Sequence, residues 1–121
     1  MDQRSANGRQ AEQQALRYLE ARGLRLLERN FRSRHGEIDL IMREAACLVF
    51  VEVRYRRSHA YGGAAASVDR NKQSRLVSTA LYYLRCHPGS AQQPTRFDVV
   101  ALTARDGATD IEWIRDAFQA D

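Results

Sequence analysis

Apolar residues recur at helical spacing in two segments of the chain, residues 7–22 and residues 69–85. The two apolar stripes consist of Ala11, Ala15, Tyr18 and Leu19 in the first segment and of Leu76, Ala80, Tyr83 and Leu84 in the second. Steps of three and four residues place such side chains on one face of a helix. Gly23 and Pro88-Gly89 follow the two segments and are typical of helix ends. The pattern therefore predicts two amphipathic helices.

Five shorter segments carry the alternating apolar, β-branched and aromatic residues that are typical of strands. These segments are residues 24–31, 37–42, 48–55, 96–102 and 111–114, and a short apolar anchor at residues 117–118 follows the last one. The predicted order is α-β-β-β-α-β-β, within a single domain that spans residues 1–121. A mixed central sheet flanked by helices on both sides would cover such a core, so the expected fold class is α/β.

The second and third predicted strands are joined by residues 43–47 only, which favours a hairpin. Side chains alternate between the two faces of a strand, so any loop of even length aligns odd positions of one strand with even positions of the other. One face of this hairpin would then be entirely apolar, formed by Ile38, Leu40, Met42, Val49, Val51 and Val53. The other face would hold Asp39 and Glu52 opposite or diagonal to each other, with Arg54 beside Glu52. A loop of odd length would separate the two acids.

Two carboxylates in the middle of apolar strands need a physical explanation, because close, buried acids resist joint ionisation unless a cation intervenes. Mg²⁺ binds oxygen ligands and accepts a site of one or two carboxylates together with substrate phosphate. A metal ion of this kind orients a hydrolytic water, and Arg54 would add a positive charge beside the phosphate. The alternative is a structural cluster in which Arg54 neutralises Asp39 or Glu52 without a metal. Spacing alone leaves both interpretations open.

Basic residues outnumber acidic ones by 19 to 15, and the resulting net charge of +4 favours polyanionic partners. Lys72 is the only lysine, since the other 18 basic residues are all arginine. Several basic residues fall near the ends of the predicted hairpin and at the start of the second helix. They would form a basic rim suited to the phosphate backbone of DNA, composed of Arg32, Arg34, Arg56, Arg57, Lys72 and Arg75. For any single arginine the alternative is a solvated surface position.

Other classes of protein are not supported by the sequence. No apolar run approaches the roughly 18–20 residues of a membrane-spanning helix, and residues 1–8 lack the apolar stretch of a signal peptide. We therefore expect a soluble, cytoplasmic protein with no membrane partner. Cys47 and Cys86 lack the close spacing of a redox pair or a zinc knuckle. The three histidines show no metal-binding spacing.

Several strings of residues resemble a known family. The chain carries GEIDLI at residues 36–41 and FVEVRYR at residues 50–56, with further matching strings at residues 8–12, 30–32, 72–75, 96–100 and 113–118. In these strings it resembles the YraN-like family of uncharacterised bacterial proteins. That family in turn resembles the restriction-endonuclease-like PD-(D/E)xK nucleases, particularly the Holliday-junction resolvases. The resemblance covers nearly the whole chain and implies a restriction-endonuclease-like fold.

The resemblance also implies roles for individual residues. Asp39 falls on the metal-binding aspartate of these nucleases, and Glu52 falls on the acidic residue of the (D/E)xK element. Glu12 corresponds to a glutamate of the first helix that can join the metal shell, and Gln73 to a helical glutamine near the site. The implied cofactor is Mg²⁺ or Mn²⁺. Arg54 stands where a lysine is expected, so the match departs from the family pattern at that position.

This departure leaves more than one functional hypothesis open. An arginine stays protonated and presents a wide planar fork, so Arg54 can stabilise negative charge but cannot accept a proton. The leading hypothesis is a metal-dependent DNA endonuclease, with branched or structured DNA as a candidate substrate. The alternative is a nucleic-acid-binding module with a degenerate, non-catalytic nuclease site, and a protein-interaction domain is a third. Related nucleases often pair, which keeps a homodimer open as a partner arrangement.

Overall fold

The structure is a computed structural model that describes residues 3–57, 63 and 67–120, with side chains described from Gly8 onward. In chain order the elements are α1 (Gln3–Glu20), β1 (Arg25–Ser33), β2 (Gly36–Glu44), β3 (Cys47–Arg56), α2 (Arg70–Cys86), the 3-10 helix η2 (Pro88–Ser90), β4 (Thr95–Arg105) and β5 (Ala108–Phe118). The predicted α/β class and the order α-β-β-β-α-β-β are confirmed. No helix within the described residues is long and apolar enough to cross a membrane.

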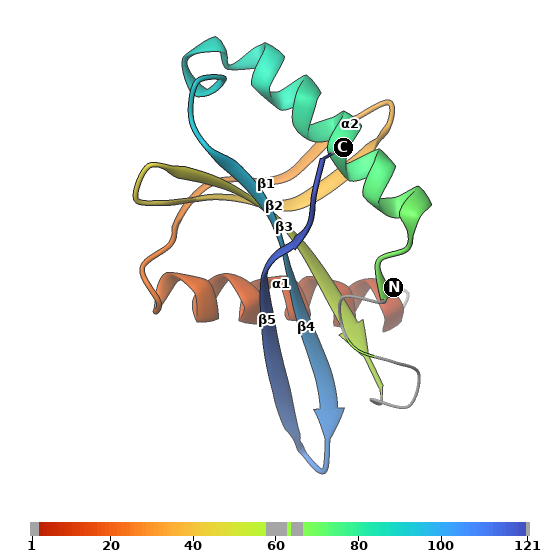
Figure 1. The fold of residues 1–121 in the computed structure, drawn as a ribbon. Helices are drawn as coiled ribbons and strands as arrows, with labels where there is room; N and C mark the ends of the chain where they lie inside the picture. The colour runs from red at the N-terminus through yellow and green to blue at the C-terminus, as the bar shows by residue number, and fades with distance from the viewer. Residues whose placement is uncertain (1–2, 58–62, 64–66, 121) are drawn as a thin grey trace.

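The strands form one five-stranded sheet in the order β1-β2-β3-β4-β5, which is also their order in the chain. β3 and β4 are parallel, whereas the other neighbouring pairs are antiparallel, so the sheet is mixed as predicted. A parallel pair needs a crossover connection, and α2 lies in the connection between β3 and β4. Figure 1 shows α1 and α2 on different sides of the strands.

The last strand is longer than the sequence pattern indicates. β5 spans Ala108–Phe118 instead of residues 111–114, because it pairs with β4 from the hairpin turn as far as Phe97↔Phe118. The predicted apolar anchor at residues 117–118 is therefore the end of β5. Irregular pairing between Phe97 and Val99 of β4 interrupts the alternation of β5 and hides its length in the sequence.

Each helix covers one face of the sheet and buries its own hydrophobic cluster. The cluster under α1 contains Ala11, Ala15, Leu16, Leu19, Leu24, Leu40, Met42, Val49, Val51, Val100 and Leu102. The cluster under α2 contains Ile38, Ile41, Leu48, Phe50, Val68, Leu76, Ala80, Tyr83, Phe97 and Val99. Neighbouring positions of β3 alternate between the two clusters, which is the behaviour of a strand buried on both faces.

The hairpin of β2 and β3 has the even loop on which the sequence argument depends. Glu44 and Cys47 form its closing pair, so two residues make the turn, and Ala45 adopts a left-handed φ of 54°. The predicted apolar face is correct for Leu40, Met42, Val49, Val51 and Val53, which lie in or against the α1 cluster.

The prediction is wrong for Ile38, which lies in the α2 cluster together with Ile41. The alternation of β2 is broken between Leu40 and Ile38. The change of face coincides with the end of the β2–β3 pairing at Leu40↔Val51, whereas the register of β1 with β2 is the same at Arg29↔Leu40 and Phe31↔Ile38. The break falls at Asp39, one of the two predicted acids.

Asp98 shows how a buried carboxylate of this sheet is satisfied. It is fully buried in β4 and accepts hydrogen bonds from Arg96 Nε at 2.9 Å, Trp113 Nε1 at 2.9 Å and the Asp116 backbone N–H at 2.9 Å. Asp98 thus ties β5 to β4 where their pairing is irregular. This agrees with a structural role for Asp98 and leaves its oxygens occupied by donors.

We predict that Asp98→Ala lowers the free energy of unfolding by about 3 kcal/mol or more, because the variant leaves Arg96 and two further donors without this buried acceptor. Asp98→Asn keeps one carbonyl oxygen as an acceptor and should lose less. Urea unfolding followed by the fluorescence of Trp113 measures both values. A loss below about 1 kcal/mol for Asp98→Ala would contradict the structural role.

Candidate metal centre

The candidate site lies where β2 separates from β3. Pairing of the two strands ends at Leu40↔Val51, although β3 continues beside β4 as far as Arg56↔Thr103. Beyond that last pair, Asp39 Oδ2 accepts a hydrogen bond of 2.8 Å from the Val53 backbone N–H. In Figure 1 the β1–β2 end runs toward α2 while β3 runs to the opposite side, which opens the sheet between them. The Asp39 side chain therefore accepts the hydrogen bond of the Val53 N–H in place of the β2 backbone, which diverges here.

Asp39 and Glu52 act on each other electrostatically across this opening, and the register of the even loop places them opposite each other. Burial first, and the charge of Glu52 second, raise the pKa of Asp39 to about 8 against the lowering effect of the Val53 N–H. Near neutral pH Asp39 therefore favours its protonated form beside Glu52.

Glu52 is buried, and its two oxygens have different surroundings. Oε2 lies 3.4 Å from Arg54 Nη1 and 3.5 Å from Lys72 Nζ. Oε1 is buried and has no hydrogen-bond partner among the described residues. A buried oxygen without a donor is uncommon and marks a place where a partner belongs. Arg54 does contact Glu52, as the structural-cluster interpretation requires, but within the described residues Oε1 has no donor and Asp39 has no ion pair.

Glu12 approaches the site from α1 and is held by Asn30 of β1. With its nitrogen toward the acids, the Asn30 amide donates to Glu12 Oε1 at 3.1 Å and to Glu37 Oε1 at 2.9 Å. Burial raises the pKa of Glu12, although the charge of Arg29 partly offsets this effect. The charge of Glu12 also contributes to the raised pKa of Asp39. Glu12 therefore belongs to the same electrostatic cluster as the two strand acids.

The residues fit a cation that needs few protein ligands. Among the described residues, no group of three or more His, Cys, Asp or Glu side chains is arranged to hold a metal ion. The close pair is Asp39 and Glu52, and Asn30 holds Glu12 outside it. Mg²⁺ matches this arrangement because it keeps several waters and needs only one or two carboxylates beside substrate phosphate. A zinc site, which takes three or four protein ligands, does not match.

Arg54 and Gln73 both attach to the segment that leads into α2. Arg54 Nη2 donates to the Ser67 carbonyl at 2.9 Å, and Gln73 Nε2 donates to the Val68 carbonyl at 3.0 Å. Gln73 makes no hydrogen bond with Asp39 or Glu52 among the described residues, so its predicted place beside the acids stays a prediction. Arg54 is beside Glu52, as the sequence indicates, but its Nη2 is held by the backbone carbonyl of Ser67.

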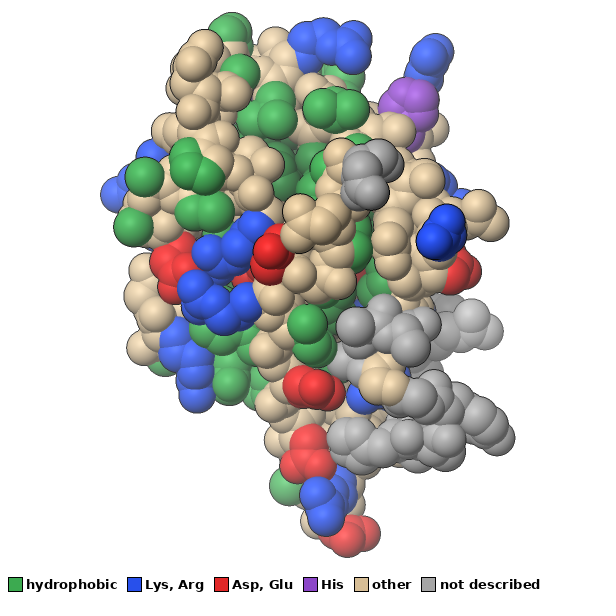
Figure 2. Space-filling view, in the orientation of Figure 1, with side chains coloured by type: hydrophobic (Ala, Val, Ile, Leu, Met, Phe, Trp, Pro, Cys, Tyr) green, Lys and Arg blue, Asp and Glu red, His purple; other side chains and the backbone are tan. Residues whose placement is uncertain are grey.

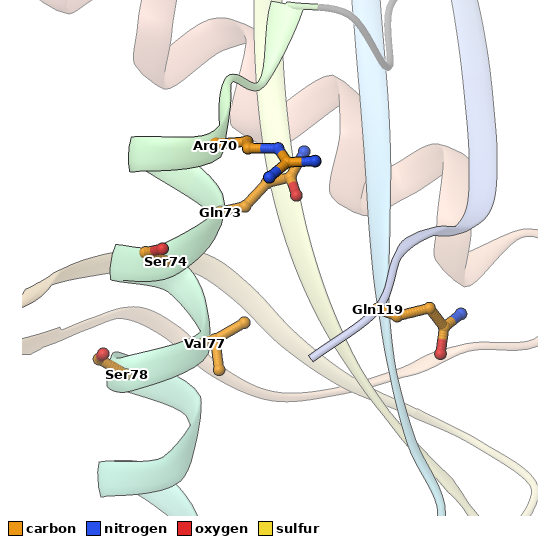
Figure 3. A pocket seen from close by; sticks show the side chains of 6 residues that line it. All are labelled: Arg70, Gln73, Ser74, Val77, Ser78 and Gln119. Carbon is orange, nitrogen blue, oxygen red and sulfur yellow. The ribbon is translucent and has the colours of Figure 1, made fainter. Parts of the chain in front are cut away.

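Gln73 also lines an open hollow of about 570 Å³ beside α2. Its lining residues are Arg70, Gln73, Ser74, Val77, Ser78 and Gln119. Figure 3 shows that Arg70 and Gln73 extend from the first turns of α2 toward the strands, while Gln119 comes from the chain after β5. The hollow is largely polar and sits next to the start of the helix that carries Lys72.

The residues of the predicted basic rim lie in several separate places, and their binding to DNA stays a prediction. Arg32 is exposed and pairs with Glu37 at 3.3 Å, whereas Arg34 lines a separate hollow between the β1–β2 turn and α2. Arg56 and Arg57 lie at and just after the end of β3, and Arg75 is exposed on α2. Figure 2 shows Lys and Arg side chains on this face in several separate groups. Only Lys72 of the rim contacts one of the two strand acids in the described part of the chain.

Sequence reasoning missed Asn30 and the direct contact of Lys72 with Glu52. Asn30 has a local signal, because asparagine tolerates the left-handed conformation that this residue adopts within β1. Lys72 was predicted as a rim residue, yet its ammonium reaches Glu52 Oε2 from the first turn of α2. That contact depends on the packing of α2 against the sheet, which spacing along the chain does not reveal.

We predict that Asp39→Asn stabilises the protein at alkaline pH. The folded state keeps a proton on Asp39 up to a pKa of about 8, whereas the unfolded chain releases it near the ordinary value of 3.8. The free energy of unfolding therefore falls as pH rises between these values. An asparagine has no such charge, so the variant should gain about 1–3 kcal/mol at pH 8 and little at pH 4.

Urea unfolding at the two pH values measures this difference. Glu112→Gln is the matched control, because Glu112 is an exposed carboxylate of β5 that makes no ion pair or hydrogen bond with Asp39 or Glu52 among the described residues. An equal gain in the free energy of unfolding for Asp39→Asn at both pH values would show that ionisation of Asp39 does not destabilise the folded protein.

Comparison with known proteins gives the chain a family. Residues 11–102 match the sequence profile described as "Uncharacterised protein family UPF0102". A UPF0102 protein of Stutzerimonas stutzeri is 51% identical over 120 residues, covering 99% of this chain and 100% of that protein. A UPF0102 protein of Nitrosococcus oceani is 52% identical over 94% of this chain and 92% of its own length. The UPF0102 protein YraN of Escherichia coli is 56% identical over 88% of this chain and 79% of its own length. On this similarity, which confirms the resemblance to the YraN-like family, the chain belongs to the uncharacterised protein family UPF0102.

Proposed function

We propose that this protein is a Mg²⁺- or Mn²⁺-dependent endonuclease that hydrolyses phosphodiester bonds in DNA. The observation that carries the proposal is the pair of Asp39 and Glu52, a half-buried and a buried acid, of which Asp39 has a raised pKa and Glu52 has one oxygen without a donor among the described residues. Asp98 of the same sheet has three donors, so the deficit is local to the divergence of β2 and β3. Carboxyl groups with perturbed pKa values are common at functional sites.

Different side chains of the site would bind the metal ion and stabilise the charge of the phosphate during hydrolysis. Asp39 and Glu52 would hold the divalent ion, which when bound supplies a polarised water and offsets the charge of the phosphate. Glu12, whose charge acts on Asp39, would bind the outer waters of that ion. In the reaction the water oxygen would form a bond to phosphorus and release a proton to solvent, the bond from phosphorus to one ester oxygen would break, and the leaving oxygen would take up a proton from solvent. Positive side chains beside Glu52 would stabilise the negative charge that develops on the phosphate oxygens.

The charge distribution supports nucleic acid as the substrate. The net charge of +4 and the two cations beside Glu52, Arg54 and Lys72, favour a polyanion. These contacts would bind phosphates without reading bases, so selection by the shape of the DNA is expected over selection by sequence. Branched DNA is therefore included as a candidate substrate.

A second candidate is a nucleic-acid-binding module whose nuclease site is degenerate. The observation in its favour is Arg54, which stands in place of a lysine and donates to the Ser67 carbonyl. If this guanidinium serves only to hold the chain, the site lacks the strand cation of the related nucleases. This candidate predicts DNA binding that weakens as salt increases, without cleavage.

We predict metal-dependent nicking of DNA that requires Glu52. Supercoiled plasmid and a four-way branched DNA are incubated with wild type, Glu52→Gln and the control Glu112→Gln, each with Mg²⁺, Mn²⁺ or EDTA. Glu52→Gln should lower the rate by about 100-fold or more, because a neutral amide binds the metal poorly and supports the transition state less. Glu112→Gln should cleave like wild type, and EDTA should abolish cleavage.

The outcomes separate the two candidates. Absence of nicking by wild type with either metal, or equal nicking by Glu52→Gln, would contradict the endonuclease proposal. Salt-sensitive binding of the same DNA without cleavage would support the degenerate module.

A second prediction concerns the proton that Asp39 holds. At pH 7 its pKa of about 8 keeps most molecules protonated, and a metal ligand must be ionised, so metal binding should release about one proton per ion. Calorimetric titration with Mn²⁺ in two buffers of different ionisation enthalpy measures the number released. Asp39→Asn should release none. Tight binding to wild type without proton release would contradict a direct bond between the metal and Asp39.

A further inference from the structure

The side chain of Lys72 reaches the site from α2, whereas the two acids lie on β2 and β3. Asp69 caps α2 by accepting a 2.8 Å hydrogen bond from the Lys72 backbone N–H, which fixes this residue in the first helical turn. From there Nζ reaches to 3.5 Å of Glu52 Oε2, on β3. The Lys72 side chain is 32% exposed, so its ammonium can contact both the buried acid and a bound substrate.

Arg54 contacts the same oxygen but is more constrained. Its Nη2 donates to the Ser67 carbonyl at 2.9 Å, and its Nη1 lies 3.4 Å from Glu52 Oε2. A guanidinium is rigid and planar, so fixing two of its nitrogens fixes the orientation of the whole group. The bond to Ser67 connects β3 with the segment immediately before α2. Arg54 is thereby suited to hold the start of the helix in place.

The two oxygens of Glu52 divide the site into two sides. Oε1 is buried without a donor among the described residues, and it is the oxygen left for a divalent ion together with Asp39. Oε2 faces the two cations. An ammonium has three donors, so Lys72 can keep one on Oε2 and direct the others to a water or to a phosphate oxygen. A compact point charge can follow the phosphate as its geometry changes, unlike a fixed fork.

We propose that Lys72 is the catalytic cation of this site and that Arg54 is a positioning residue, which holds residues 67–69 and so places Lys72. The assignment rests on the proposed nuclease function and deepens it. The cation that the (D/E)xK pattern expects on β3 is supplied from the first turn of α2. Lys72 contacts the attacking water or the phosphate oxygens of DNA, whereas Arg54 acts on the reaction only through the position of α2.

The test compares substitutions at the two positions on DNA that wild type cleaves. The variants are Lys72→Met, Lys72→Arg, Arg54→Lys and Arg54→Met, with Arg85→Met as the control for loss of one positive charge from α2. The measurements are the single-turnover rate at saturating DNA, the Kd for DNA in Ca²⁺, and the midpoint of thermal unfolding. A purely structural role of Lys72 would change the unfolding midpoint without changing the single-turnover rate.

We expect Lys72→Met to lower the single-turnover rate by about 100-fold or more, with Kd and unfolding midpoint close to those of wild type. Lys72→Arg keeps the charge but not its shape, and should be at least about tenfold slower than wild type. Arg54→Lys should cleave within about tenfold of wild type, and Arg54→Met should lower the unfolding midpoint by several degrees because the bond to Ser67 is lost. Arg85→Met should cleave at the wild-type rate.

The outcomes distinguish this assignment from the proposed function beneath it. Absence of cleavage by wild type would overturn both. Cleavage by wild type together with a wild-type rate for Lys72→Met would overturn the role of Lys72 alone. Should Lys72→Met fail to fold, Lys72→Arg carries the test, and an unchanged rate in that variant overturns the assignment. A larger loss of rate in Arg54→Lys than in Lys72→Arg would do the same.

Discussion

The hydrogen bond from the Val53 N–H to Asp39 is the interaction on which the rest of the site depends. It forms where β2 turns away from β3, so a side-chain oxygen replaces the strand partner that the Val53 N–H loses. One consequence is that the sheet can open without leaving a buried donor unpaired. The other is that the Asp39 carboxyl lies beside Glu52, where burial and like charge oppose its ionisation. A backbone requirement thus brings together two acids that would otherwise repel each other.

Asp98 shows that this sheet can bury an acid without the same conflict. Both Asp39 and Asp98 accept a backbone N–H of a neighbouring strand where pairing is irregular. Asp98 also has the guanidinium of Arg96 and the indole of Trp113, while Asp39 has a second carboxyl for a neighbour. The two positions differ in what surrounds them and not in their backbone role. A divalent ion would give Asp39 what Arg96 gives Asp98, namely a positive charge within bonding distance, while Glu52 already contacts Arg54 and Lys72.

The sequence allowed the fold and the central pair to be predicted because both depend on local periodicity. The two-residue turn between Glu44 and Cys47 fixes the register of the hairpin, and the period of two then brings Asp39 and Glu52 to one site. The parts that were missed depend on events beyond one strand. Ile38 lies on the opposite face from Leu40 just where β2 stops pairing with β3, and the sequence pattern of one strand does not reveal where two strands separate. The contact of Lys72 with Glu52 depends on how α2 docks on the sheet, and no period in the chain encodes that distance.

The basic residues of the chain are almost all arginine, and this bears on the contact of Lys72 with Glu52. Eighteen of the 19 basic residues are arginine, and a preference that extends over the whole sequence says little about any one of them. The same preference makes the single lysine informative, because a position that tolerated either cation would be expected to carry arginine here. Arg54 has a role that suits arginine, because its rigid guanidinium donates to the backbone carbonyl of Ser67. A compact ammonium over Glu52 does something that fork cannot, because it can turn from a carboxylate toward a ligand without breaking a fixed geometry.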